Sequence, residues 1–312
     1  MSGDREVEAA GDIRPNFFIV GAPRCGTTAL YAYLEQHPDV FMPYHKEPVF
    51  FGADLGKRPR SFDREAYLNL FKRGIGRKRR GEATVWYLYS QAAPEEIRAF
   101  SPDARIIIML RNPVDMIYSL HSHQLFTADE EIEAFEEALA AESDRRAGRR
   151  IPATTTRPEG LLYRDCGRYA SHVRRWLTAF GPDAVKVIIF DDFSADPAGV
   201  YRQTLEFLDL DSTFQPEFNV VNRNKGVRSQ RLLALTSSPR FYAATRWLPG
   251  PLFHAFRRGL KRLNTRHRSR PPMDPELRRE LTAEFAPDVE ELGRVIGRDL
   301  SRWSAVAPPP AA

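Results

Sequence analysis

Residues 16–34, NFFIVGAPRCGTTALYAYL, are the stretch that most constrains how this chain can fold. The apolar run 17–20 is typical of a short buried strand, and the pattern after it predicts a helix that begins near Thr27. Gly21, Pro23 and Gly26 lie in the turn between them. A glycine-containing loop that enters a helix directs backbone N–H groups, carrying roughly half an elementary charge, at an anion. The stretch therefore predicts a phosphate-binding loop in an α/β protein.

The side chains of this loop add donors but do not match the nucleotide triphosphate loop. Arg24, Thr27 and Thr28 supply a guanidinium and two hydroxyls close to the helix start. The spacing G-x4-G-T-T puts Thr27 where G-x4-G-K-[ST] requires the lysine that serves the β- and γ-phosphates. A P-loop kinase that uses ATP is therefore the less favoured alternative.

The loop also carries a family resemblance. VGAPRCGTTALYAYL, residues 20–34, resembles the 5′-phosphosulfate loop of sulfotransferases that use 3′-phosphoadenosine-5′-phosphosulfate (PAPS), in particular the heparan sulfate branch and its bacterial relatives. The resemblance implies a P-loop-like three-layer α/β/α sandwich around a central, mainly parallel sheet. It assigns donor binding to the residues Gly21, Arg24, Cys25, Gly26, Thr27 and Thr28.

A second motif supplies a candidate base. Residues 46–51, KEPVFF, put a lysine and a glutamate beside a proline and three apolar residues, at the mouth of a buried segment. They resemble the family's K-E-P-x-F-F motif, which implies that Glu47 deprotonates the acceptor, with Arg24 as its catalytic partner on the donor. A positioned carboxylate typically contributes about 10²–10⁴-fold to such a reaction. The alternative is a solvated surface pair of Lys46 with Glu47.

A third motif follows a predicted strand at 104–110, whose isoleucine-rich sequence is typical of a parallel sheet covered on both faces. Arg111 ends this strand, and Pro113 is well placed to open a helix that carries Asp115 and Ser119 on one face. The pattern resembles the family's R-N-P-x-D-x-x-x-S motif, which implies that Arg111 and Ser119 bind the 3′-phosphate. A later basic loop, by the same resemblance, adds Lys225, Gly226 and Arg228.

One stretch departs from the family. Residues 81–87 resemble the family's E-K-[ST]-P-x-Y stretch, but Ala83 stands where many members have lysine and Val85 where proline is common. That lysine is usually linked to the transferring sulfate or the acceptor. We therefore expect Glu82 and Trp86 only to line the cleft.

Composition and length favour one globular domain. The 312 residues are 42% hydrophobic and 28% charged, which is enough to bury a full core. No repeat or Gly/Ser linker divides the chain, so we expect one domain over 15–303, a polar tail at 1–14 and an Ala/Pro-rich tail at 304–312. Two cysteines and the lack of a secretory h-region favour a cytoplasmic location.

The net charge of +5 and the isoelectric point near 9.2 favour an anionic ligand. No zinc-finger spacing or RNA-binding aromatic signature supports nucleic acid as the partner. Residues 241–270 alternate apolar residues with arginine and predict a basic helix. The favoured interpretation packs it on its own domain; the alternative is a weak contact with a membrane or an anionic acceptor.

Other segments give coarser predictions. The polar run 52–80, which ends in GRKRR at 76–80, predicts a solvated loop, and 129–150 predicts an acidic, solvent-facing helix and a charged turn. Strands or helices are expected at 40–42, 94–100, 185–190, 199–208 and 275–296, and an amphipathic helix is expected with Val173, Trp176, Leu177 and Phe180 inward. His121 and His123 lie about 200° apart on a helix and cannot ligate one metal from one face, so we predict no metal.

The motifs together predict in-line transfer of a sulfuryl group from PAPS to a hydroxyl or amine, with PAP as the product. The acceptor is a glycan, a glycolipid or a small metabolite, and no motif decides between them. A non-catalytic nucleotide-binding protein remains an alternative. A phosphatase built on Cys25 is disfavoured because its C-x5-R spacing meets Tyr31. The residues leave the oligomeric state open.

Overall fold

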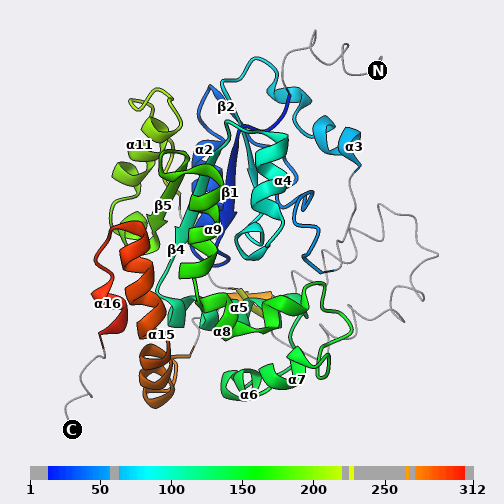
Figure 1. Ribbon diagram of the computed structural model, residues 1–312, viewed down its shortest axis with the longest axis vertical. Helices are drawn as coiled ribbons and strands as arrows, with labels where there is room; N and C mark the ends of the chain where they lie inside the picture. The colour runs from blue at the N-terminus through cyan, green and yellow to red at the C-terminus, as the bar shows by residue number, and fades with distance from the viewer. Residues whose placement is uncertain (1–12, 57–62, 220–224, 228–264, 268–270, 306–312) are drawn as a thin grey trace. The chain divides into compact units, whose positions relative to one another are not determined.

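The computed structural model describes residues 13–56, 63–219, 225–227, 265–267 and 271–305 (Figure 1). These fall into two compact units. Unit 1 comprises the described residues within Met1–Met116, Arg168–Val221 and Thr282–Ala312, and unit 2 those within Ile117–Gly167 and Asn222–Leu281. The expectation of a single domain over 15–303 with tails at either end stays a prediction.

Unit 1 is built on a five-stranded sheet in the order β2-β3-β1-β4-β5, and every neighbouring pair is parallel. The registers pair Phe17 with both Gly81 and Arg105. The strands β1 and β4 are central and consist of FFIVG and RIIIML, because only near-continuous apolar runs suit strands covered on both faces. The strands are β1 Phe17–Gly21, β2 Val40–Phe41, β3 Arg79–Ala83, β4 Arg105–Leu110 and β5 Val185–Ile189.

Helices cover both faces of this sheet, as Figure 1 shows, with α4 and α9 in front of the strands and α2 behind them. On the far side, the Tyr201 hydroxyl of α11 donates to the backbone oxygen of Tyr33 in α2. The expected α/β architecture with a mainly parallel central sheet is confirmed. The helices of unit 1 are α2 Thr27–Leu34, α3 Arg64–Asn69, η1 Lys72–Gly74, η2 Tyr87–Tyr89, α4 Ala93–Phe100, α9 Ala170–Phe180, η4 Pro182–Ala184, α10 Phe190–Ala195, α11 Pro197–Phe207 and α16 Ser301–Ser304.

Two helices run from one unit into the other, α5 Pro113–Thr127 and α15 Pro275–Ile296. The part of α15 in unit 1 is fixed to α9 by polar contacts. The carboxylate of Asp288 accepts the backbone N–H of Tyr169 at 2.7 Å, and Arg174 pairs with Glu291. The indole of Trp303 donates to Asp191 at 2.9 Å, which fixes α16 beside α10.

An aromatic cluster fills the core of unit 1. The ring of Phe50 stacks on Tyr67 with centroids 4.1 Å apart and an angle of 8° between the planes. Phe51 meets Phe18 of β1 and Phe100 of α4 edge to face. Burying such rings removes apolar area from water and so stabilises the packing against the sheet. The cluster also anchors the segment just after Glu47.

The polar run 52–80 is not simply a solvated loop. Arg77 and Lys78 are exposed as expected, but Arg80 is buried and donates through Nε to the Arg14 oxygen at 2.9 Å. Arg79 forms an ion pair with Asp209 at 2.6 Å. The run contains α3 and η1 and ends in β3, because hydrogen bonds and ion pairs satisfy the arginines that open this strand.

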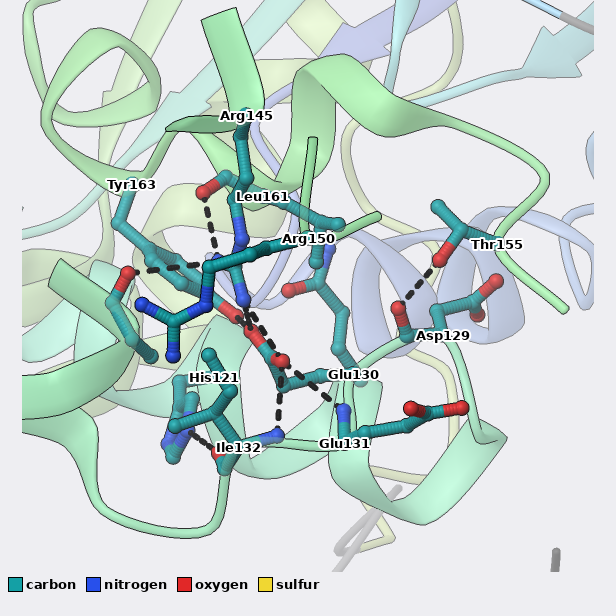
Figure 2. Close-up of polar contacts among 12 residues, drawn as sticks. His121, Asp129, Glu130, Glu131, Ile132, Arg145, Arg150, Thr155, Leu161 and Tyr163 are labelled. Carbon is teal, nitrogen blue, oxygen red and sulfur yellow. Dashed lines mark hydrogen bonds and ion pairs between the residues drawn. The ribbon is translucent and has the colours of Figure 1, made fainter. Parts of the chain in front are cut away.

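Unit 2 contains a buried ion pair where the sequence predicts a solvent-facing helix. Arg145 and Glu130, with side chains 1% and 0% exposed, meet at 2.7 Å (Figure 2). Tyr163 donates to Glu130 at 2.8 Å. The prediction of solvent exposure over 129–150 is therefore wrong at these residues, because each charge has a partner in the interior. The short helices of this unit are α6 Phe135–Ala140, α7 Glu142–Arg146, η3 Pro158–Leu161 and α8 Tyr163–Gly167.

Unit 2 also holds a two-stranded antiparallel pair, β6 Lys225–Val227 with β7 Thr265–His267, in which Lys225 pairs with His267. The basic loop predicted over 222–228 thus contains a strand, and the helix predicted over 241–270 is a strand at 265–267. Backbone pairing between distant segments overrides the local helical pattern at these positions. The other residues of 241–270 lie outside the described part of the chain. Among the described residues, no helix combines the length and the apolar character needed to cross a membrane.

Candidate active site

The loop between β1 and α2 is held tightly at both ends. At Gly21, an added Cβ would come within 2.5 Å of the Leu88 Cβ and 2.9 Å of the Val85 oxygen. The N–H of Ala22 donates to the Met109 oxygen of β4 at 2.7 Å. Because the Leu88 side chain of η2 and the Val85 oxygen approach so closely, only glycine fits at position 21. The loop is therefore fixed at the carboxyl ends of β1 and β4.

Gly26 caps α2 with φ of 89° and no side-chain cap hydrogen bond. A Cβ there would lie 3.0 Å from a ring carbon of Phe190 and 3.4 Å from the Met109 methyl. The left-handed conformation and the close ring both favour glycine. The N–H groups of Ala29 and Leu30 donate to the Gly26 oxygen at 2.9 and 3.2 Å. Because the first N–H groups of a helix precede its hydrogen-bonded ladder, this end of α2 can bind an anion through Thr27 and Thr28.

Two guanidinium groups gather at this loop. Arg24 has a left-handed φ of 64°, and its pKa is lowered by burial and then by the charge of Arg111. Arg111 follows β4, lies 4.9 Å from the centroid of the Phe190 ring and 4.0 Å from the Asp115 carboxylate. Because the two like charges repel, an anion that contacts both would be strongly favoured.

Cys25 is not available as a nucleophile. Its side chain is buried, its thiol donates to the Pro23 oxygen at 3.4 Å, and burial raises its pKa to about 12 despite the nearby arginines. A thiol without a thiolate is a poor nucleophile, which weighs further against a cysteine phosphatase. Only its backbone can contribute to an anion site.

Glu47 lies beside the loop. Its backbone N–H donates to the Ala83 oxygen at 3.0 Å, and its φ of 61° is left-handed, as is the φ of 55° at Val49. Such a conformation is costly for residues other than glycine and is common at functional sites. The ammonium of Lys46 is 3.4 Å from the Glu47 carboxylate and donates to the Thr28 hydroxyl at 3.3 Å. One lysine thus connects the candidate base to the loop.

Glu82 lies deeper in unit 1 than the expected position in the lining of a cleft. It is fully buried, accepts hydrogen bonds from the hydroxyls of Tyr67 and Thr84, and has a pKa raised by burial to about 7. The charge of Glu47 also favours a raised pKa, whereas hydrogen bonds to Tyr67, Thr84 and Tyr87 act in the opposite direction. Trp86 is half-buried and lies 5.6 Å from the Tyr89 ring.

A tyrosine ties this buried carboxyl to the segment that carries Glu47. The Tyr87 hydroxyl accepts the backbone N–H groups of Phe50 at 2.9 Å and Phe51 at 3.1 Å. Burial, and then the charge of Glu82, raise the pKa of Tyr87. The segment that follows Glu47 is therefore held by a network of buried polar groups.

Unit 1 contains the predicted loop residues 21–28 together with Lys46, Glu47 and Arg111, while Ser119, Lys225, Gly226 and Arg228 belong to other parts of the chain. Ser119 is buried on α5 in unit 2, and β6 of the same unit contains Lys225 and Gly226. Arg228 lies outside the described residues. The assignment of these four to the 3′-phosphate stays a prediction.

Some residues around the site were not predicted from the sequence. Phe190 contacts both Gly26 and Arg111, yet a phenylalanine that follows an apolar strand gives no signal except apolar packing. Lys46 could have been predicted as a site residue, since it belongs to the KEPVFF motif that also contains Glu47. Among the described residues, no group of three or more His, Cys, Asp or Glu side chains could hold a metal ion.

Fold and site together define an α/β protein with an anion-binding loop at the carboxyl ends of central parallel strands and a carboxylate beside it. The family model described as the sulfotransferase domain matches residues 14–225. The chain belongs to the sulfotransferase family.

A solved structure supports the same conclusion over most of the chain. The sulfotransferase from Alicyclobacillus acidocaldarius is 34% identical, with a TM-score of 0.71, over 94% of this chain and 99% of the other. At this level of identity the likeness covers sequence as well as fold.

Curated relatives are similar over a smaller share of their length. The human bifunctional heparan sulfate N-deacetylase/N-sulfotransferase 3 is 29% identical over 210 residues, 64% of this chain and 23% of the relative. The human heparan sulfate glucosamine 3-O-sulfotransferase 6 is 27% identical over 247 residues, 76% of this chain and 64% of the relative. The chain thus spans less than two thirds of the length of these two relatives.

Proposed function

We propose that this chain transfers a sulfuryl group from PAPS to a hydroxyl or amine of a carbohydrate acceptor. The observation that carries the proposal is the contact of Lys46 with both Thr28 and Glu47, which sets a carboxylate next to an anion-binding loop. Membership of the sulfotransferase family supports the type of reaction. The donor and the acceptor are inferences from the family and the chemistry of the site.

The residues of the loop fit the 5′ end of such a donor. Gly26 leaves the helix start open, Thr27 and Thr28 supply N–H groups and hydroxyls, and Arg24 and Arg111 supply two positive charges. This set of hydrogen-bond donors and positive charges suits an anion of high charge density. Ser119, Lys225, Gly226 and Arg228 are proposed to bind the 3′-phosphate, together with Arg111.

PAPS, when bound, supplies the sulfuryl group: the acceptor oxygen or nitrogen forms a bond to sulfur while the sulfur–oxygen bond to the 5′-phosphate breaks. Glu47 takes the proton of the acceptor, and the electron pair of the broken bond stays on the phosphate oxygen. Arg24 and the N–H groups of the loop stabilise the charge that develops there, as fixed dipoles and cations do in group transfer. Proton transfer to a positioned base of this kind typically raises the reaction rate by about 10²–10⁴-fold.

The acceptor class is proposed from the printed names of relatives. Two are the heparan sulfate sulfotransferases described above, and a third is the mouse carbohydrate sulfotransferase 15, 25% identical over 70% of this chain. A sugar hydroxyl or amine is therefore the favoured acceptor, ahead of a glycolipid or a small metabolite. Tyr44, three positions before Glu47, is fully exposed, which is compatible with a large acceptor.

The first test is calorimetry with EDTA present. We expect PAP to bind without metal, whereas binding of ATP only with Mg²⁺ would favour the kinase alternative.

The second test incubates the chain with radiolabelled PAPS and a panel of chemically desulfated glycosaminoglycans, glycolipids and small phenols. Label transferred to a glycan supports the proposal, and PAP binding without any transfer would favour a non-catalytic nucleotide-binding protein.

A further inference from the structure

Lys46 is the side chain that contacts both halves of the candidate site. Its ammonium donates to the Thr28 hydroxyl at 3.3 Å and lies 3.4 Å from the Glu47 carboxylate. The side chain is 23% exposed, so the contact is partly shielded from water. Screening is weaker there than on an open surface, and a charge in this place has a larger effect on its neighbours.

Both contacts of this ammonium are on fixed parts of the fold. Thr28 is in the first turn of α2, which Gly26 holds against Phe190. Glu47 is held through its backbone N–H to Ala83 of β3. A cation between two fixed groups is pre-organised, so little reorganisation is needed when charge changes at either one.

We infer that Lys46 is a functional residue of the transfer reaction, which orients the Glu47 carboxylate and stabilises the leaving 5′-phosphate oxygen at the Thr28 end. The inference rests on the proposed function and extends it to a residue with no assigned role. A lysine next to a glutamate in sequence would otherwise be an ordinary surface ion pair, worth little.

The charges of the reaction favour this role. Before transfer, the Lys46 charge is shared between the ionised Glu47 and the loop. As the bond from acceptor to sulfur forms, the acceptor proton moves to a Glu47 oxygen, and Glu47 becomes neutral. The electron pair of the broken sulfur–oxygen bond moves to the phosphate oxygen in the same step. The Lys46 charge is then fully available to that oxygen, so its stabilisation is larger in the transition state than in the ground state.

The experiment compares Lys46→Met, Lys46→Gln and Lys46→Arg with the wild-type chain. Lys72→Met is the matched control, because Lys72 is an exposed lysine of η1 in the same unit. We measure PAP affinity by calorimetry in EDTA, the melting temperature, and kcat and KM with PAPS and the desulfated glycan that the wild-type chain sulfates best. Two neutral variants are used so that a folding defect in one does not decide the result.

A role in the transition state predicts that the neutral variants lose kcat by about 10²-fold while the KM for PAPS changes less than about threefold, because the leaving oxygen gains its charge only as the sulfur–oxygen bond breaks. Lys46→Arg should recover at least about a tenth of the wild-type kcat, since it keeps the charge. Lys72→Met should behave as wild type.

Two results would overturn the inference alone: kcat of the neutral variants close to wild type, or a rise in the KM for PAPS as large as the loss of kcat. A loss of kcat in Lys46→Arg equal to that of the neutral variants would also contradict it, because charge would then not be the cause. A wild-type chain that binds no PAP or sulfates no acceptor would instead overturn the proposed function, and the inference with it.

Discussion

The proposed function gives Glu47 and Arg111 separate chemical roles, although both lie in unit 1. Arg111 lies at the end of β4, its charge lowers the pKa of Arg24, and its guanidinium suits the binding of an anion. Glu47 is a carboxylate held at the mouth of the loop by its backbone bond to Ala83. Binding and proton transfer should therefore be separable by single substitutions.

Glu47→Gln should keep the affinity for PAP and reduce kcat by about 10²–10⁴-fold, because the amide cannot accept the proton. Arg111→Ala should weaken PAP binding by about 1.5–3 kcal/mol, which is the usual worth of a hydrogen bond to a charged group. Calorimetry and initial rates on the same preparations measure both. Equal PAP binding by the Arg111→Ala chain would count against the assignment of Arg111.

At the scale of elements, β3 is a strand of the central sheet that the sequence does not indicate. RRGEA lacks the apolar run that made β1 and β4 predictable, yet it pairs with β1 over residues 81–83. Its charged groups have buried partners, including the hydroxyls of Tyr67 and Thr84 around Glu82. A polar strand of this kind depends on tertiary contacts that no local pattern encodes.

The same dependence on tertiary contacts explains which parts of the site could not be predicted from the sequence. Gly26, Arg24 and Thr28 follow from the loop pattern, because a strand, a glycine turn and a helix start are local features. The contact of Lys46 with Thr28 needs β3 beside β1, and the contact of Phe190 with Arg111 needs β5 beside β4. The loop and the Glu47 carboxylate could thus be predicted from the sequence, while the groups around them required the sheet order; the role of Glu47 as a base stays a prediction.

The burial of Glu82 should make stability fall as the pH rises. Its pKa is about 7 in the fold and 4.5 ordinarily. Between these values the unfolded chain releases the proton and the folded chain keeps it, so each pH unit costs roughly 1 kcal/mol. The pH dependence ends near pH 7, where Glu82 ionises in both states.

Thermal unfolding at pH 5 and pH 7.5 tests this, with Glu82→Gln compared with the wild-type chain. The wild-type chain should lose more stability over this interval than Glu82→Gln, which has no proton to release. The exposed Glu95 provides the control, since Glu95→Gln should show the wild-type dependence. Equal pH dependence in Glu82→Gln and wild type would show that Glu82 does not titrate in this range.

The ion pair of α7 should contribute to the stability of unit 2. Arg145→Met leaves the Glu130 charge buried without its cation, which typically costs about 3–5 kcal/mol. The neighbouring pair of Arg146 with Asp165 is 45% and 43% exposed, so Arg146→Met should cost less than about 1 kcal/mol. Urea unfolding of both variants measures the difference, and similar costs for the two would refute the buried role.

At the scale of the whole molecule, the candidate residues are divided between two compact units. Unit 1 contains the loop, Glu47 and Arg111, and unit 2 contains Ser119 and Lys225. The motifs predict that residues of both contact one nucleotide. If this is correct, PAP must affect both units at once.

Hydrogen exchange tests that expectation on the full chain. Adding PAP should slow exchange at residues 21–28 of unit 1 and at β6 of unit 2, because bound backbone groups open less often. ATP with Mg²⁺ is the comparison ligand and should protect less. Protection confined to unit 1 would remove Ser119 and Lys225 from the nucleotide site.

The parallel sheet has a kinetic consequence. Phe17 pairs with Arg105, and Ile106 pairs with Val185, so each central pairing joins residues some eighty positions apart. Chains of high contact order must close long loops before any pairing stabilises them, and they fold slowly. Until the sheet closes, the apolar strand RIIIML is exposed to other chains, so slow dilution and low temperature should raise the yield of refolded protein.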